Sequence, residues 1–133
     1  RDKWQTEGTK TFLGIHSNGF PNLFVVTGPQ GGGGSFNFTD AIETHADYIV
    51  WMLSEMRDEG HEIVDVTEQA EIEFAEHCRD MDVAPAPLRD CLSYYNGHGD
   101  AEPGSLAYYG GGNWHKFRVR AQESLDPYVF GSA

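Results

Sequence analysis

The sequence predicts a fold of the α/β class, in which short apolar strands alternate with amphipathic helices. An apolar run from Leu23 to Thr27 enters a glycine-rich loop, and a helical repeat of apolar residues begins soon afterwards at Thr39. The segment from His61 to Val66 alternates polar with apolar residues, as a half-buried strand does. A strand that leads glycine-rich backbone to a helix start is how α/β enzymes bring main chain close to a bound molecule.

Two strands are predicted near the start of the chain. The segments from Thr11 to Ile15 and from Leu23 to Thr27 are short apolar runs bounded by turn residues, which is the pattern of buried strands. Between them, Asn18-Gly19 is a strong turn signal. Because few helices follow to cover both faces of a sheet, we expect these strands to be an edge taken from a larger sheet.

A long helix is predicted from Thr39 to Glu59. Thr39 suits the N-cap position, Asp40 falls in the first turn, and Gly60 suits the end of the helix. Apolar residues recur within it at alternating spacings of four and three residues, so we expect one buried stripe. That stripe consists of Ile42, Ala46, Ile49, Leu53 and Met56.

The second half of the chain predicts a further set of elements. After the strand from His61 to Val66, Thr67 caps a helix that runs from Glu68 to Met81. The apolar face of this helix holds Ala70, Phe74, Cys78 and Met81. Prolines predict an extended connector over residues 83–90. The last predicted elements are two aromatic strands, Leu92 to Asn96 and Leu106 to Tyr109, and a short helix from Asn113 to Glu123.

The composition excludes several classes of partner. The formal net charge of −12 repels the phosphates of nucleic acid and of anionic lipid, so neither is an expected partner. No apolar run approaches the roughly 18 residues that span a membrane. Cys78 and Cys91 form no CxxC motif, and such sparse cysteine usage predicts a reduced, cytoplasmic protein. The acidic cluster is interpreted as a solvated helix face; it consists of Glu68, Glu71, Glu73 and Glu76.

The glycine loop from Gly31 to Ser35 has three interpretations. A phosphate cradle lacks support because neither a Walker motif nor GxGxxG is present, and an engineered glycine–serine spacer is the second alternative. The third is an active-site loop in which missing side chains leave room for a bulky substrate. The six histidines show no metal-binding spacing, and no Gly-x-Ser-x-Gly motif indicates a hydrolase.

Ordered motifs along nearly the whole chain resemble those of the flavin-dependent Baeyer–Villiger monooxygenases. Because several motifs follow one another in the family's order, the resemblance is more specific than any single motif. The motifs are Trp4 with Gly8, Phe12-Leu13-Gly14, Gly19 to Phe24, Thr27 to Pro29, Asn37, Ile42 to His45, Ser93 to Gly97 and Tyr108 to Gly111.

The resemblance implies the C-terminal portion of a flavoprotein with two dinucleotide-binding domains. Residues 1–38 would hold the last strands of the FAD domain and the active-site loop, and residues 39–133 a helical and aromatic segment that closes over FAD and NADP. The implied enzyme uses FAD and NADPH to insert one oxygen atom of O2 into a ketone, giving an ester or lactone. The implied partners are the ketone, O2 and the upstream nucleotide-binding domains. Without a GxGxxG fingerprint or an initial Met, this chain is expected to be an inactive piece of that enzyme.

The same motifs imply site residues, none of them catalytic or metal-binding. The implied substrate-lining residues are Gly33, Gly34, Ser35 and Phe36. The implied cofactor-binding residues are Gly28, Pro29, Asn37, Phe38 and Tyr94. Phe38 matches a residue that touches the flavin, and Tyr94 matches a tryptophan that contacts the NADP nicotinamide ribose.

The glycines of the loop replace bulkier family residues, so the expected ketone is large, cyclic or long-chain. Two further hypotheses remain open. One is a module without catalysis that binds a flavoprotein partner or an apolar ligand, and the other is a flavin monooxygenase that oxidises nitrogen or sulfur.

Overall fold

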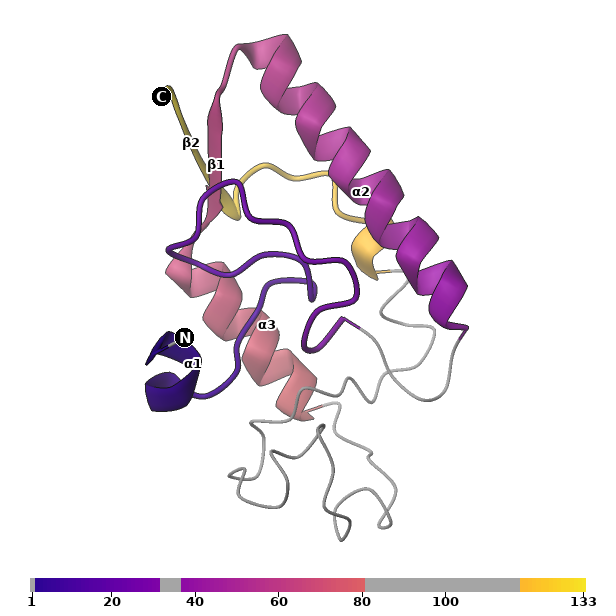
Figure 1. Cartoon of the computed structure of the whole chain (residues 1–133), viewed down its shortest axis with the longest axis vertical. Coiled ribbons are helices and arrows are strands. Elements are labelled where there is room, and N and C mark those ends of the chain that lie inside the picture. Colours follow the sequence, from indigo (N-terminus) through magenta and orange to yellow (C-terminus); the bar gives the residue numbers. More distant parts are fainter. Residues whose placement is uncertain (1, 32–36, 81–117) are drawn as a thin grey trace, which may run out of the picture.

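Helices and a two-stranded antiparallel sheet surround a coiled segment in the computed structural model, which describes residues 2–31, 37–80 and 118–133 (Figure 1). The elements in chain order are α1 (Asp2–Glu7), α2 (Phe38–Glu59), β1 (Ile63–Val66), α3 (Glu68–Asp80) and β2 (Tyr128–Gly131). The two strands pair with Ile63 opposite Gly131 and Val66 opposite Tyr128. Figure 1 shows α2 along one side of the molecule, with the coiled segment between it and the α1 end of the chain.

The core lies where the irregular segment after α1, residues 8–31, meets α2, α3 and the sheet. Leu13 and Ile15 from the coil and Met52 from α2 have no exposed surface. Phe12 packs edge-on against Phe74 of α3, with 5.9 Å between the ring centroids. Because these residues come from distant parts of the sequence, their burial holds the described segments together.

Neither strand predicted before α2 forms in the described residues. The segments Thr11 to Ile15 and Leu23 to Thr27 consist of turns and coil. Phe12 and His16 instead exchange backbone hydrogen bonds of 2.9 and 3.1 Å across a tight turn, with Leu13 at a φ of 58°. The prediction was wrong because the apolar pattern reports burial, and here packing buries the first run without strand pairing.

Asn22 takes the place of a neighbouring strand beside β1. Its backbone N–H donates to the carbonyl of Val64, and its Oδ1 accepts from the N–H of Val64, both at 2.9 Å. Its Nδ2 also donates to the carbonyl of Glu62 at 3.0 Å. Asparagine tolerates the φ of 60° that this arrangement requires. A single residue thereby fixes the start of the apolar run that follows it.

Helix α2 begins at Phe38 rather than at Thr39, because Asn37 is its N-cap. The Oδ1 of Asn37 accepts from the backbone N–H of Thr39 at 3.0 Å, which satisfies one of the free donors of the first turn. The helix ends at Gly60 in the left-handed conformation, with a φ of 72°, as the sequence predicts.

The buried face of α2 is rotated by about one residue from the predicted stripe. The buried residues are Ala41, Thr44, His45, Tyr48, Met52 and Met56. Within the predicted stripe only Met56 is buried, Ile49 is half-buried, and Ile42, Ala46 and Leu53 are exposed. The prediction was wrong because the true inner face includes polar residues that find hydrogen-bond partners in the core.

Glu71 of α3 is buried rather than solvated. Its side chain is 1% exposed, and the Nζ of Lys3 lies 2.7 Å from its Oε2. The hydroxyl of Ser17 and the backbone N–H of Asn18 donate to its Oε1 at 3.1 and 3.0 Å. The interpretation of this carboxylate as part of a solvated face was wrong, because partners from α1 and from a turn satisfy it.

Of the remaining predictions, some are confirmed, some are wrong and some fall outside the described residues. Strand β1 and helix α3 lie where the sequence places them, with Phe74 and Cys78 buried. The last helix ends at Arg120, before the predicted limit, while α1 and β2 were not predicted. The connector over residues 83–90 and both aromatic strands lie outside the described residues. In the described part of the chain, no helix has the length and apolar character needed to cross a membrane.

Candidate functional site

The turn from Gly28 to Gly31 packs its backbone directly against the backbone at Gly14. The N–H of Gly28 donates to the carbonyl of Gly14 at 3.0 Å, and the N–H of Gly31 donates to the carbonyl of Gly28 at 2.9 Å. A Cβ added to Gly14 would lie 2.0 Å from the Cα of Gly31, and one added to Gly28 would lie 2.6 Å from the carbonyl oxygen of Gly14. Glycine is required here because a side chain would collide with main chain.

Gln30 anchors the turn from inside. Its side chain accepts at Oε1 from the backbone N–H of Thr11 at 3.0 Å and donates at Nε2 to the carbonyl of Thr9 at 3.1 Å. The residue is 1% exposed and its φ is 62°. The Thr11 hydroxyl donates to the carbonyl of Pro29 at 2.8 Å. These bonds fix Gly28 and Pro29, two of the predicted cofactor-binding residues, relative to the core.

His45 fastens the same turn to α2. It has no exposed surface, and its Nδ1 accepts from the backbone N–H of Thr27 at 2.9 Å. Burial lowers the pKa of His45 from its ordinary value of 6.5 to about 4. The imidazole is therefore neutral at pH 7, with its proton on Nε2. A neutral acceptor is the form that the N–H of Thr27 needs.

The start of α2 presents two more of the predicted cofactor-binding residues. Asn37 is exposed, and Phe38 is 63% exposed. An open hollow of about 670 Å³ adjoins this cap; it is lined by Asn37, Thr39, Asp40, Ile42 and Glu43.

The charges around this hollow select against an anionic ligand. Asp40 and Glu43 both line it, and the guanidinium of Arg120 lies 3.8 Å from a carboxylate oxygen of Asp40. Two carboxylates repel a phosphate, whereas the exposed ring of Phe38 and the side chain of Ile42 offer an apolar surface to a flat, uncharged group. Among the described residues, this region therefore suits a flat, uncharged group better than a phosphate.

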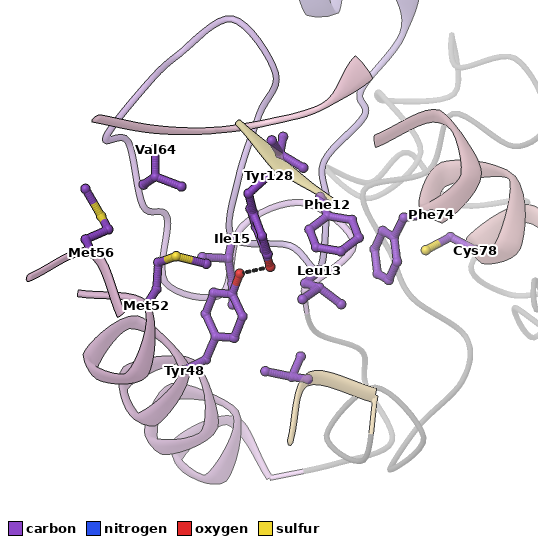
Figure 2. Close-up of a cluster of buried hydrophobic side chains, with 12 residues drawn as sticks. Phe12, Leu13, Ile15, Tyr48, Met52, Met56, Val64, Phe74, Cys78 and Tyr128 are labelled. Carbon is purple, nitrogen blue, oxygen red and sulfur yellow. Dashed lines mark hydrogen bonds between the residues drawn. The ribbon is translucent and has the colours of Figure 1, made fainter. Parts of the chain in front are cut away.

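A buried chain of polar side chains supports α2 on its inner face. The Nε2 of His16 lies 2.9 Å from the hydroxyl of Tyr48. The Tyr48 hydroxyl in turn bonds to the hydroxyl of Tyr128, as the dashed line in Figure 2 shows. Burial lowers the pKa of His16 to about 4 and raises the pKa of both tyrosines. All three groups are therefore neutral at pH 7. The sequence did not predict this group of three polar residues, because nothing in their spacing indicates that they are in contact.

The structure places four of the nine predicted binding residues in its described part. Gly28 and Pro29 lie in the anchored turn, and Asn37 and Phe38 lie at the start of α2. The other five lie outside the described residues; they are Gly33, Gly34, Ser35, Phe36 and Tyr94. Among the described residues, no group of three or more His, Cys, Asp or Glu could hold a metal ion.

Several known proteins are similar in sequence to this chain, one of them over nearly its whole length. The chain is 34% identical to a Baeyer–Villiger monooxygenase from Streptomyces coelicolor over 95% of the chain, which is 21% of that protein. It is 42% identical to a polycyclic ketone monooxygenase from Thermothelomyces thermophilus over 53% of the chain, which is 11% of that protein. The chain thus spans about a fifth of the length of the first relative. No family model matches it.

Solved structures share the fold. A cyclohexanone monooxygenase from Rhodococcus sp. Phi1 bound to NADP+ matches with a TM-score of 0.79 at 26% identity, over 99% of this chain and 25% of that one. An oxidised steroid monooxygenase bound to NADP matches with a TM-score of 0.80 at 23% identity, over 99% of this chain and 24% of that one. The predicted fold class, α/β as the C-terminal portion of such a flavoprotein, is confirmed.

Proposed function

Because this chain belongs to the Baeyer–Villiger monooxygenase family, we propose that it forms part of an enzyme that oxidises a ketone to an ester or lactone. Similarity over nearly the whole chain, including the anchored turn from Gly28 to Gly31, carries this proposal. In the proposed reaction, one oxygen atom of O2 enters the ester and the other leaves as water, with two electrons supplied by NADPH. The proposed partners are the ketone, O2 and the remaining portion of the enzyme.

The proposed cofactors are FAD and NADPH. When bound, FAD supplies the oxygen-activating chemistry, and the protein contributes binding, orientation and electrostatics. Support comes from the exposed ring of Phe38 and from the fixed backbone at Gly28 and Pro29. Asn37 and Tyr94 complete the proposed cofactor contacts of this chain. The carboxylates of the hollow leave the cofactor phosphates to the remaining portion of the enzyme.

The proposed substrate is a bulky ketone. Gly33, Gly34, Ser35 and Phe36 form the proposed substrate-lining loop, in which glycines free space that larger side chains would fill. The relative with 42% identity is a polycyclic ketone monooxygenase, which supports a large substrate.

We also propose the division of the chain that its motifs imply. Residues 1–38 belong to the FAD domain. The exposed apolar side chains of Phe20, Leu23 and Val26 support this assignment, because exposed apolar side chains indicate a surface that packs against another part of the protein. Residues 39–133 form the segment that closes over FAD and NADP. The cytoplasmic location stays part of the proposal, and it agrees with the free, buried thiol of Cys78.

A hybrid enzyme tests the function. In the Streptomyces coelicolor monooxygenase, this chain replaces the stretch that it matches. We expect the purified hybrid to retain flavin and to convert a polycyclic ketone into its ester or lactone with NADPH and air, but to leave cyclohexanone largely unchanged. Phe38→Ala should release flavin from the hybrid, whereas Val129→Ala, at an exposed apolar residue of β2, should not.

Three results would contradict the proposal. A hybrid that binds flavin but oxidises only amines or sulfides would indicate a different reaction. A preference for cyclohexanone over the polycyclic ketone would contradict the bulky substrate. Equal flavin retention by Phe38→Ala and the unaltered hybrid would remove Phe38 from the cofactor site.

A further inference from the structure

Helix α2 carries apolar residues outside the face that it buries within this chain. At about 100° per residue, the residues buried within the chain cover an arc of about 120°. A second apolar arc, about 80° wide, lies beside it and faces outward. We call this second arc the outer stripe; it consists of Ile42, Ala46, Val50 and Leu53, all exposed.

The members of the outer stripe follow one another along one side of α2. Val50 is 63% exposed, Leu53 is 49% exposed and Ile42 is 38% exposed. Their spacings of four, eight and eleven residues from Ile42 place them on one side of the helix. A helix that meets solvent on its outer side normally carries polar residues there, so a second apolar face indicates a second packed layer.

The shape of this surface selects a protein partner. A helix face is convex, so it fits a groove or a sheet rather than enclosing a small molecule. We infer that the outer stripe of α2 packs against the portion of the monooxygenase that lies outside this chain. This inference rests on the proposed function, because it takes its partner from the relatives' additional length, about four-fifths of the first one.

Charge supports this occupant over a second copy of the chain. Glu43 and Asp47 are exposed and follow the outer stripe along the polar side of α2. Two copies that met through this face would bring the same acidic residues together, and each copy carries a net charge of −12. The partner face is therefore apolar, with lysine or arginine opposite Glu43 and Asp47.

Thiol footprinting in the hybrid enzyme tests the inference. Val50→Cys places a thiol in the outer stripe, and Asp58→Cys places one on the polar side of α2, where the carboxylate is 66% exposed. Both should react with a maleimide in the isolated chain, as located by peptide mass mapping. In the hybrid, we expect labelling at residue 50 to be lost and labelling at residue 58 to persist. Equal labelling of residue 50 in both proteins would overturn the inference.

Two further measurements separate the possible outcomes. Sedimentation of the isolated chain tests the second copy, because a dimer that dissociates in Val50→Glu would overturn the inference. Ketone oxidation by the hybrid tests the function independently, since an active hybrid in which the Val50→Cys thiol still reacts rejects the interface but keeps the function. A hybrid that does not accumulate is replaced by the Val50→Cys chain mixed with the separately expressed remaining portion of the relative. Protection at residue 50 then supports the inference, and unchanged labelling overturns it.

Discussion

The inner and outer faces of helix α2 differ in composition, because the inner face mixes polar with apolar side chains and the outer stripe does not. The inner face, buried within the chain, carries Thr44, His45 and Tyr48 beside apolar residues such as Met52. The outer stripe is entirely apolar and exposed. Hydrophobicity alone would therefore bury the wrong side of the helix. The difference teaches that a polar residue can lie in a core where it finds hydrogen-bond partners. It also teaches that an apolar face can be exposed in one segment of a protein when another segment is needed to cover it.

The largest expected effect contrasts two neighbouring residues on these faces. Met52 is fully buried and Leu53 is 49% exposed. Met52→Ala should lower the free energy of unfolding by about 2–5 kcal/mol because it leaves a cavity. Leu53→Ala should lower it by less than about 1 kcal/mol in the isolated chain, because a half-exposed side chain leaves no cavity. Urea unfolding of both variants measures the contrast, and equal losses would show that the outer stripe is already packed.

The next effect concerns the polar core behind the inner face. Tyr48→Phe should cost about 2 kcal/mol, because it leaves His16 and the hydroxyl of Tyr128 without their shared partner. Tyr128→Phe and the double variant complete a thermodynamic cycle. If the three groups act as one chain, the double variant should lose less than the sum of the single losses. Additive losses would mean that the two tyrosines act independently.

These contrasts also mark how far the sequence could predict the molecule. Local sequence patterns predict helices α2 and α3, strand β1, the end of α2 at Gly60 and the family. They do not predict the buried face of α2, the burial of Glu71 or the pairing of β2. Each depends on a partner far away in the sequence, such as Lys3 for Glu71. The local spacing of apolar residues gives no information about such a partner.

The candidate site shows the same division. The motif around Gly28 indicates where glycine backbone is needed, whereas the sequence pattern places the start of α2 at Thr39 instead of at its N-cap, Asn37. They do not reveal that Gln30 and His45 hold the turn, because a buried glutamine and a buried histidine have no characteristic spacing. Only the structure shows that Gly28 packs on Gly14 and thus has a structural role besides any contact with a cofactor.

A pH titration sharpens the view of the polar inner face. His16 and His45 have pKa values lowered to about 4 in the folded chain, whereas the unfolded chain binds protons near pH 6.5. Stability should therefore be complete above pH 6.5 and fall as the pH drops toward 4. Each histidine should contribute about 1.4 kcal/mol per pH unit.

Matched variants isolate this effect between pH 7 and pH 5.5, above the usual titration of carboxyl groups. His16→Gln keeps an acceptor at the position of Nε2, and His45→Asn keeps one at the position of Nδ1. Each variant should flatten the pH dependence of urea unfolding. An unaltered slope in both variants would mean that other groups carry the dependence.

The smallest of these effects lies at the N-cap, where the inner and outer faces of α2 both begin. Asn37→Ala should cost about 1 kcal/mol, because the N–H of Thr39 loses its acceptor. Asn37→Asp keeps an acceptor and should cost little. If both variants unfold at the same urea concentration, the side chain of Asn37 does not stabilise α2 by capping it.

The most direct test of the whole account is the visible absorption spectrum of the isolated chain after incubation with FAD and dialysis, compared with that of the hybrid enzyme. In our proposal, this chain supplies a fixed turn and an apolar surface for a ring, while the phosphates of the cofactor are held elsewhere. We therefore expect a colourless isolated chain and a yellow hybrid that retains flavin. A yellow isolated chain with one flavin per 14.8 kDa molecule would contradict it.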